Sequence, residues 1–481
     1  MRGSNLLKMM CIMFMFCVIT AFASLAQTFT TLDSLDSKHG AFPSAALSQA
    51  ADGNLYGTAP AGGVYDYGTV FKITVAGRLT TLQSFDGTDG SSYATLIQGS
   101  DGNFYGTTAA GGTTNNGTVF KITAAGTLMT LYSFCSQTNC TDGTDPSGLV
   151  QATNGSFYGT TIGGGGHGNY GTVFKITPGG RLTTLYSFCA QANCTDGTYP
   201  SLGLIQATDG NFYGTTSEGG GNGVHGYGTI FKITAAGTLT TLHTFCAQAN
   251  CTDGRYPTGL MQATDENLYG TTEDGANAYS GTVFQLNRAG TLTTLYTFCA
   301  QANCADGSYP TGLVQASDGN FYGTTQYAGA NNNAGTVFQF TPAGTLTTLY
   351  NFCSQTNDKG YCGDGRNPSA GLVQDTNGTF YGTTQGGGYS NGGTVFSLSV
   401  GLGPFVKTYP TSGKVGAKVI ILGNNVKGTI SVTFNGTTAP LLKVTASAIE
   451  TSVPIGATTG PVVVTTPSGT LNSNVAFRVL P

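Results

Sequence analysis

The sequence predicts an all-β protein: a seven-bladed β-propeller closed by its own N-terminal strand, followed by an immunoglobulin-like β-sandwich. First, a phrase with a Tyr-Gly-Thr core recurs about every 55 residues, a period typical of propellers and repeat arrays. Second, the last copy ends at Thr394-Val395-Phe396 without its final segment, and that segment stands near the N-terminus at residues 30–35. Third, the pattern changes after residue 402. The copies are marked by Tyr56, Tyr105, Tyr158, Tyr213, Tyr269, Tyr322 and Tyr381.

Residues 1–26 are predicted to be an export signal. Arg2 and Lys8 give a positive start, residues 9–22 are apolar, and Ser24-Leu25-Ala26 forms a small-x-small cleavage pattern. The apolar run is shorter than a comfortable membrane span. We therefore expect a secreted protein whose mature chain has no membrane span.

Composition narrows the class of partner. Only 9% of the residues are charged and the net charge is −4, so the basic footprint of a nucleic-acid-binding protein is absent. The 74 glycines suit an exported all-β protein with many tight turns. We expect a monomer without a nucleic-acid partner.

Ten cysteines lie beyond the signal and form five local pairs at one point of successive repeats. Each repeat has either both cysteines of the pair or neither, a pattern that predicts disulfides. The alternative, zinc, would need pairs from different repeats to converge on one metal. A bridge across so short a loop contributes roughly 2 kcal/mol, which fixes a loop and does not create the fold. The pairs are Cys135/Cys140, Cys189/Cys194, Cys246/Cys251, Cys299/Cys304 and Cys353/Cys362.

Each repeat is expected to supply four short antiparallel strands, the shape of one propeller blade. In the copy around Tyr158 these are residues 148–152, 156–161, 171–177 and 182–188, rich in β-branched and aromatic residues. Asp-Gly and Asn-Gly turns join the first two strands because both residues tolerate positive φ. An open β-solenoid is the alternative, but it would have no use for the displaced strand.

Strand direction assigns the variable segments to one face of the predicted disc. In a meander, the connections from the second to the third strand and from the fourth strand to the next blade share a face. That face carries the Gly-rich loops and the cysteine pairs, and variable loops on a rigid scaffold are where binding residues gather. It also carries an aspartate after each cysteine pair: Asp142, Asp196, Asp253, Asp306 and Asp364.

The candidate ligand-binding residues lie on this face. Tyrosine and polar side chains in its loops favour a glycan, by ring stacking and hydrogen bonding. The plainer interpretation is that histidines in Gly-rich loops are merely exposed. The five junction aspartates either ring a Ca²⁺ ion, which prefers clustered oxygens, or act as turn residues; we expect no other cofactor. The candidates are His167, Tyr170, Glu218, His225, Tyr227, Asp253, Arg255 and Tyr279, of which Glu218, His225, Asp253 and Arg255 belong to one repeat.

Catalytic signatures are scarce. The sequence contains no H-E-x-x-H, P-loop or C-x-x-C motif. Acidic residues are few and lie in different loops, so no pair of carboxylates can be assigned. We assign no catalytic or metal-binding residues and favour a binding protein over an enzyme.

The phrase G-L-V-Q-A-T-D-G-N-F-Y-G-T-T, followed by G-T-V-F-K-I-T and G-T-L-T-T-L-Y-S-F, resembles the Gloeo/Verruco (GloVer) tandem repeat of exported bacterial proteins. The resemblance covers about residues 28–400. It implies an extracellular protein and carries no established activity. Members often have a C-terminal anchor or sorting signal, and this chain departs from that pattern at Val479-Leu480-Pro481.

The blade rhythm is also similar to that of propeller lyases of the streptogramin-inactivating type, whose catalytic site uses His with Mg²⁺. Their site residues do not match here one by one, so the similarity concerns the blade pattern.

From residue 403 the chain resembles an IPT/TIG domain, in words such as Val419-Ile420-Ile421-Leu422-Gly423 and Val432-Thr433-Phe434-Asn435-Gly436. The resemblance implies an immunoglobulin-like sandwich, which the alternating strands and Gly, Pro and Asn turns indicate independently. The expected division is a signal at 1–26, a propeller at 27–402 and a sandwich at 403–481.

These observations favour a secreted or cell-surface binding or adhesion protein. The loop face would engage a glycan or a surface protein, and the sandwich would space or attach it. A propeller-type lyase or hydrolase acting outside the cell and a structural surface component are the alternatives.

Overall fold

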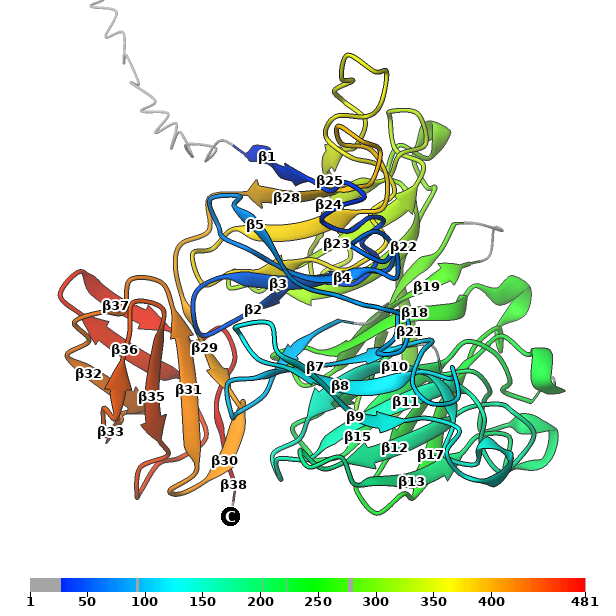
Figure 1. Cartoon of the computed structure of the whole chain (residues 1–481), viewed down its shortest axis with the longest axis horizontal. Coiled ribbons are helices and arrows are strands. Elements are labelled where there is room, and N and C mark those ends of the chain that lie inside the picture. The colour runs from blue at the N-terminus through cyan, green and yellow to red at the C-terminus, as the bar shows by residue number, and fades with distance from the viewer. Residues whose placement is uncertain (1–26, 92–94, 201, 222, 276–279, 481) are drawn as a thin grey trace, which may run out of the picture.

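A computed structural model describes residues 27–91, 95–200, 202–221, 223–275 and 280–480. The predicted export signal lies outside the described residues. Seven four-stranded antiparallel sheets form the blades of a propeller, and a β-sandwich follows them (Figure 1). The seven-bladed fold predicted from the repeat is confirmed.

The first six blades take their strands in sequence order. Blades 1 to 3 consist of β2 (Ser48–Gln49), β3 (Leu55–Ala59), β4 (Thr69–Ile73) and β5 (Leu79–Ser84); β6 (Ile97–Gln98), β7 (Phe104–Thr108), β8 (Thr118–Ile122) and β9 (Leu128–Ser133); and β10 (Thr144–Gln151), β11 (Phe157–Gly163), β12 (Thr172–Ile176) and β13 (Leu182–Ser187). Blades 4 to 6 consist of β14 (Ile205–Gln206), β15 (Phe212–Thr216), β16 (Thr229–Ile233) and β17 (Leu239–Thr244); β18 (Arg255–Gln262), β19 (Leu268–Asp274), β20 (Thr282–Leu286) and β21 (Leu292–Thr297); and β22 (Ser308–Gln315), β23 (Phe321–Tyr327), β24 (Thr336–Phe340) and β25 (Leu346–Asn351).

Blade 7 is built from both ends of the propeller sequence. It contains β26 (Val373–Gln374), β27 (Phe380–Thr384), β28 (Thr394–Ser399) and, as its outer strand, β1 (Thr28–Ser34). β1 pairs antiparallel with β28, with Thr31 opposite Phe396 (Figure 1). The Phe29 ring stacks on Tyr350 of blade 6 at 3.8 Å between centroids. The displaced strand therefore fastens the ring, as its position in the sequence predicted.

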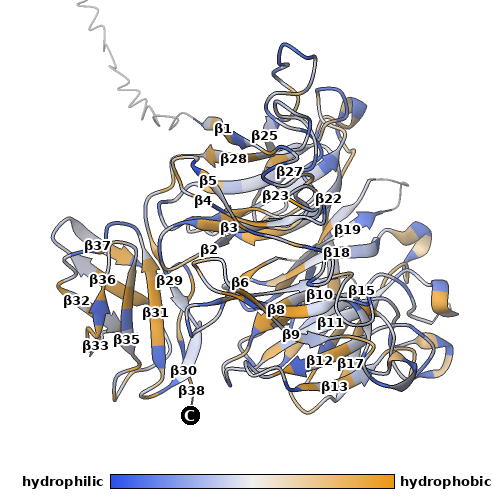
Figure 2. Cartoon of the chain, viewed as in Figure 1, coloured by the Kyte–Doolittle hydropathy of each residue, from blue (hydrophilic) through white to orange (hydrophobic). Residues whose placement is uncertain are grey.

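The repeated Phe-Tyr-Gly-Thr word packs one blade onto the next. At five junctions, the tyrosine of one blade lies 3.9–4.4 Å, between ring centroids, from the phenylalanine of the next: Tyr56–Phe104, Tyr105–Phe157, Tyr158–Phe212, Tyr269–Phe321 and Tyr322–Phe380. These rings are buried, and hydrophobic residues gather in the strands while the loops are more polar (Figure 2). At the other two junctions a leucine, Leu55 or Leu268, occupies the place of the phenylalanine.

The glutamine of the Leu-Val-Gln word also joins neighbouring blades. The Gln98 amide oxygen accepts the backbone N–H of Ala51 at 2.9 Å, and Gln151 accepts that of Ser100 at 2.8 Å. Gln206, Gln262, Gln315 and Gln374 make the same bond to the blade before them. These bonds tie the turn of one blade to the inner strand of the next, on the face that carries the short turns.

The strands define two faces of the propeller. The loop face carries the connections from second to third strands and between blades, and the turn face carries the short turns within blades. Short 3-10 helices lie on the loop face: η1 (Thr138–Cys140), η2 (Ala192–Cys194), η3 (Gly223–His225), η4 (Ala249–Cys251) and η5 (Ala302–Cys304).

The C-terminal sandwich has a core of Val, Ile, Leu and Phe side chains between two sheets. One sheet contains β29 (Val406–Tyr409), β31 (Lys418–Gly423), β35 (Ala448–Ser452) and β34 (Lys443–Val444); the other contains β33 (Thr437–Ala439), β32 (Ser431–Phe434), β36 (Val462–Thr466) and β37 (Gly469–Asn472). β30 (Ser412–Lys414) pairs in parallel with the last strand, β38 (Arg478–Leu480). The predicted sandwich is confirmed.

The sandwich contacts the turn face of the propeller. The Ser447 hydroxyl donates to the Ala51 carbonyl at 2.7 Å, and the Phe405 N–H donates to the Thr376 carbonyl at 3.0 Å. Ala51 and Thr376 belong to turns between first and second strands, so the loop face is the face left open. Within the described part of the chain, none of the helices has the length and apolar character needed to cross a membrane.

Candidate functional site

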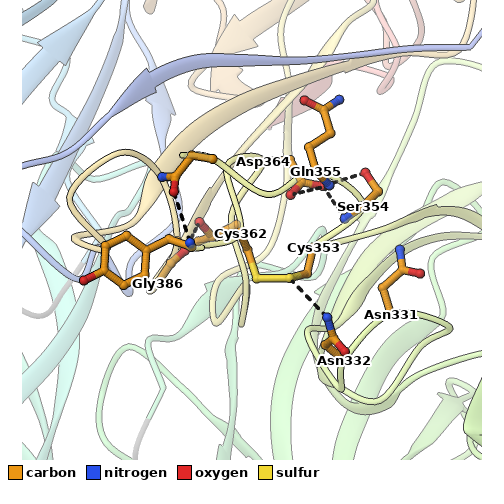
Figure 3. The surroundings of a disulfide bond; sticks show 12 residues. Asn331, Asn332, Cys353, Ser354, Gln355, Cys362, Asp364 and Gly386 are labelled. Atoms are coloured by element: carbon orange, nitrogen blue, oxygen red, sulfur yellow. Dashed lines mark hydrogen bonds between the residues drawn. A yellow bond between two sulfur atoms is a disulfide. The ribbon is translucent and has the colours of Figure 1, made fainter. Parts of the chain in front are cut away.

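A buried aspartate organises each of five inter-blade loops on the loop face. The Asp196 side chain is fully buried; one carboxylate oxygen accepts from the Tyr186 hydroxyl at 2.8 Å and from the Ala190 N–H at 2.9 Å. In the loop shown in Figure 3, Asp364 accepts from the backbone N–H groups of Ser354 and Gln355. The carboxylates therefore bind their own loops, as the turn interpretation predicted.

The Ca²⁺ alternative has no support in this geometry. The five junction aspartates are each occupied by donors from their own loop, and among the described residues no three His, Cys, Asp or Glu side chains form a group suited to a metal ion.

Disulfides fix the same five loops. All predicted pairs are bonded: Cys135–Cys140, Cys189–Cys194, Cys246–Cys251, Cys299–Cys304 and Cys353–Cys362. Asn332, from the loop before β24, lies against the Cys353 sulfur (Figure 3). Bridge and buried aspartate together hold a rigid rim around the loop face.

The loop after blade 4 has a histidine where the others have a tyrosine. His243 Nε2 lies 3.1 Å from the Asp253 carboxylate, and the Ala247 N–H also donates to it at 3.1 Å. Burial raises the pKa of Asp253, but the hydrogen bonds from His243 and Ala247 outweigh it, and the pKa lies below its ordinary value of 3.8. Asp253 was a predicted ligand-binding residue; the structure places its carboxylate inside the loop, away from solvent.

Acid should weaken this loop through Asp253. Because its pKa is lower in the folded protein than in the unfolded chain, its stabilisation is complete above about pH 4 and is lost as the pH falls through the folded-state value. We expect the free energy of unfolding to decrease below about pH 4, and Asp253→Asn to show a shallower decrease. Urea denaturation followed by circular dichroism across this pH range measures both; identical pH slopes would contradict the prediction.

Tyrosines stand at the start of the inner strand in three successive blades. The residue before the proline at the start of an inner strand has a positive φ in six of the described blades, and in three successive ones it is a tyrosine: Tyr199 (55°), Tyr256 (56°) and Tyr309 (56°). A bulky residue in this region is unusual and is held by its surroundings. The Tyr199 and Tyr256 N–H groups each donate at 3.0 Å to a carbonyl of the preceding blade, that of Tyr170 or Tyr227.

We call these tyrosines, with the rings packed on them, the aromatic collar. Tyr170 lies edge-on to Tyr199 at 5.7 Å between centroids, Tyr227 to Tyr256 at 6.0 Å and Tyr327 to Tyr309 at 5.2 Å. The collar covers blades 3 to 6. At the corresponding pre-proline positions of three other blades stand Phe42, Asp145 and Asn367, so the mouth is not symmetric.

Charged residues join the collar between blades 4 and 5. The Arg255 guanidinium lies 5.9 Å from the Tyr227 ring centroid and 5.8 Å from that of Tyr256. It also forms a salt bridge with Asp274 at 3.1 Å. The position of Arg255 over two rings is therefore fixed by a partly buried carboxylate.

A cavity of about 270 Å³ opens beside the collar, at the mouth of the inner strands. Its walls include the rings of Tyr256 and Tyr309 and the polar side chains of Glu273, Gln326 and Ser369. Burial by the walls and repulsion from the Asp274 carboxylate raise the pKa of Glu273. The Ser369 hydroxyl has no hydrogen-bond partner among the described residues, which leaves a donor and an acceptor for a ligand.

The structure brings together four of the eight predicted binding residues, namely Tyr170, Glu218, Tyr227 and Arg255, at or beside the collar. His225 is 84% exposed, and its Nδ1 lies 3.3 Å from the Glu218 carboxylate. His167 is exposed in the loop before β12, Asp253 is buried, and Tyr279 lies outside the described residues.

Sequence reasoning missed the residues that line the cavity. Its candidates came from the Gly-rich loops, whereas Tyr256, Tyr309 and Glu273 lie at strand ends. A signal was present: the dipeptide Tyr-Pro occurs at three successive junctions, where other copies have Phe-Pro, Asp-Pro or Asn-Pro.

Fold and cavity define the class of protein: a seven-bladed propeller with a recessed aromatic and polar cavity on its open face. The chain belongs to the family of the Gloeobacter/Verrucomicrobia repeat, whose model matches residues 17–140, 135–303 and 221–439. An IPT/TIG domain matches residues 405–479. No curated protein matches the chain.

Solved structures resemble the fold at low sequence identity. An extracellular domain from B. thetaiotaomicron, described as part of a hybrid two-component system, is 12% identical with a TM-score of 0.50, over 90% of this chain and 52% of its own. PorZ of Porphyromonas gingivalis, described as a bacterial surface component of the type-IX secretion system, is 13% identical with a TM-score of 0.47, over 91% and 59%. This chain thus spans little more than half of either protein, and the first supports the fold alone.

Proposed function

We propose that this protein is exported and binds an extracellular glycan in the cavity beside the aromatic collar, with the sandwich on the opposite face as a spacer or attachment unit. Export is supported by the five disulfides, which persist in oxidising compartments, and by the signal-like residues 1–26.

The asymmetry of the collar is the observation that carries the proposal. Residues that serve every blade recur in every blade, as the stacked tyrosines do. Tyr199, Tyr256 and Tyr309 instead occupy the pre-proline position in three successive blades only, and three other blades hold the same positive φ with a different residue. The departure from the repeat therefore lies in the side chains, and aromatic rings gathered on one side of the loop face favour a single binding site over a role in every blade.

The cavity walls suit a sugar ring. Tyr256 and Tyr309 offer amphipathic surfaces on which a pyranose can stack. Glu273, Gln326 and Ser369 offer donors and acceptors for the hydroxyl groups of a sugar. A few polar groups among apolar walls are typical of a small-molecule site.

The binding function is favoured over the lyase or hydrolase alternative by what lines the cavity. Glu273 is the only acidic or histidine side chain among the described lining residues, whereas hydrolysis of a glycosidic bond commonly uses two carboxylates. Residues 388–392 match the G-x-S-x-G motif of serine hydrolases. They lie in a loop between two strands, whereas a nucleophile elbow is followed by a helix.

Replacing the two cavity tyrosines should weaken glycan binding. We expect Tyr256→Ala and Tyr309→Ala to lower affinity about tenfold or more each, a loss of about 1.4 kcal/mol, because the sugar loses a stacking surface. A glycan array with the mature protein identifies the ligand, and calorimetry measures the affinities.

Tyr389→Ala is the matched control, because Tyr389 is 64% exposed in the blade 7 loop and lies outside the cavity. Wild-type protein that binds no glycan, or cavity variants that bind like Tyr389→Ala, would overturn the proposal. Cleavage of a bound glycan that stops in Glu273→Gln would establish the enzymatic alternative instead.

A further inference from the structure

Two blade junctions lack the phenylalanine ring that the five others contain, and the one between blades 4 and 5 is open. At the junction of blades 2 and 3, the Tyr105 ring contacts both a lysine and a phenylalanine. Its centroid lies 5.6 Å from Lys121 Nζ and 4.1 Å from the centroid of the Phe157 ring. In blade 4, Lys232 lies 5.7 Å from the Tyr213 ring centroid, but the next blade supplies Leu268. No other aromatic ring of the described residues stacks on Tyr213.

A hollow of about 450 Å³ occupies this junction, on the turn face and within reach of the sandwich. Its apolar walls are Tyr213, Leu242, Leu268 and Leu286. Tyr213 is half-buried, whereas the other six repeat tyrosines are at most 3% exposed. A leucine in place of phenylalanine is not sufficient to form such a hollow. At the ring closure, Leu55 also replaces the phenylalanine, yet the neighbouring Tyr381 remains buried.

The rim of the hollow is cationic on the side of the sandwich. Lys232 is paired with Asp209 at 2.9 Å, and Arg288 is paired with Glu266. Arg478, from β38 of the sandwich, also lines the hollow and is in no salt bridge among the described residues. One positive charge thus remains without a carboxylate at the edge of an apolar space.

We propose that this hollow is a second binding site, which takes an aromatic carboxylate. The ligand's ring replaces the phenyl ring that the five other junctions contain, stacking on the free face of Tyr213. Its carboxylate faces Arg478, which recognises such groups through paired N–H donors. The site uses both the propeller and the sandwich, and it is independent of the glycan cavity on the opposite face.

The substitution Leu268→Phe tests the proposal by restoring the sequence of the other junctions. We expect 1-naphthoate, measured by calorimetry on the full mature chain, to bind the wild-type protein and to bind Leu268→Phe at least tenfold more weakly. Leu268→Ile is the control, since it keeps the volume of leucine and should bind as the wild type does. Leu286→Phe, at the cross-strand partner of Leu268 in blade 5, is a second blocking variant should Leu268→Phe fail to fold.

The charge contact has its own measurement. Arg478→Gln should weaken 1-naphthoate binding at least fivefold while leaving the binding of neutral 1-naphthamide unchanged. Wild-type protein that does not bind 1-naphthoate at millimolar concentration would overturn the proposal. So would a blocking variant that folds and binds like the wild type, or an Arg478→Gln effect of equal size on acid and amide.

Discussion

Removing residues 27–34 is expected to open the propeller. Without β1, blade 7 has three strands, β28 becomes an exposed edge, and Phe29 no longer covers Tyr350 and Phe396. The loss of a strand's hydrogen bonds and of one large aromatic contact should cost about 5 kcal/mol or more. The exposed edge of β28 can also pair with a strand of another molecule, so the shortened chain should aggregate.

Point substitutions separate packing from strand pairing in this closure. Phe29→Ala should lose about 2 kcal/mol, since the ring is only half-buried, whereas the outward-facing Thr30→Ala should change stability by less than about 0.5 kcal/mol. Calorimetric melting of the three variants measures these effects. Addition of a peptide of residues 27–36 should raise the melting temperature of the shortened chain. If the shortened chain melts like the full one, β1 does not fasten the ring.

Asp306→Ala is expected to be among the most damaging single substitutions on the loop face. Asp306 is fully buried and accepts from the Tyr296 hydroxyl at 2.8 Å and from the N–H groups of Ala300 and Gln301 at 3.0 and 3.2 Å. Alanine leaves three donors without their charged acceptor, which should cost about 3 kcal/mol. Urea denaturation followed by circular dichroism measures the loss.

Tyr296→Phe is the matched control for this loop. It removes one donor and leaves the carboxylate its two backbone partners, so the expected loss is about 1 kcal/mol. Hydrogen exchange at Ala300 and Gln301 should accelerate in Asp306→Ala and remain slow in Tyr296→Phe. A loss below about 1 kcal/mol in Asp306→Ala would show that water replaces the carboxylate as acceptor.

The candidate site was only partly predictable. The loop face followed from strand direction, and Tyr170, Tyr227 and Arg255 were found because they stand in or beside its variable loops. The cavity itself depends on which strand ends meet around the axis, and residues as distant as Glu273 and Ser369 share its walls. Such proximity depends on the closure of the ring, and no local pattern encodes it.

The assignment of the junction aspartates shows the same division. The aspartates after the cysteine pairs admitted a Ca²⁺ ring or a turn role, and sequence spacing alone could not separate them. The structure decides for the turn role because each carboxylate is occupied within its own loop, as Asp196 is by Tyr186 and Ala190.

By itself, the sequence determined the blade count, the strand order, the ring closure, the disulfide pairs and the open face. Each follows from local repetition, since strands adjacent in the chain pair with one another and Thr30 and Thr31 complete the last copy. Only the tertiary structure decided where neighbouring blades leave a cavity between them. Beside Tyr256 and Tyr213, the fit of one blade against the next leaves a cavity, because packing at a junction depends on side chains that lie far apart in the chain.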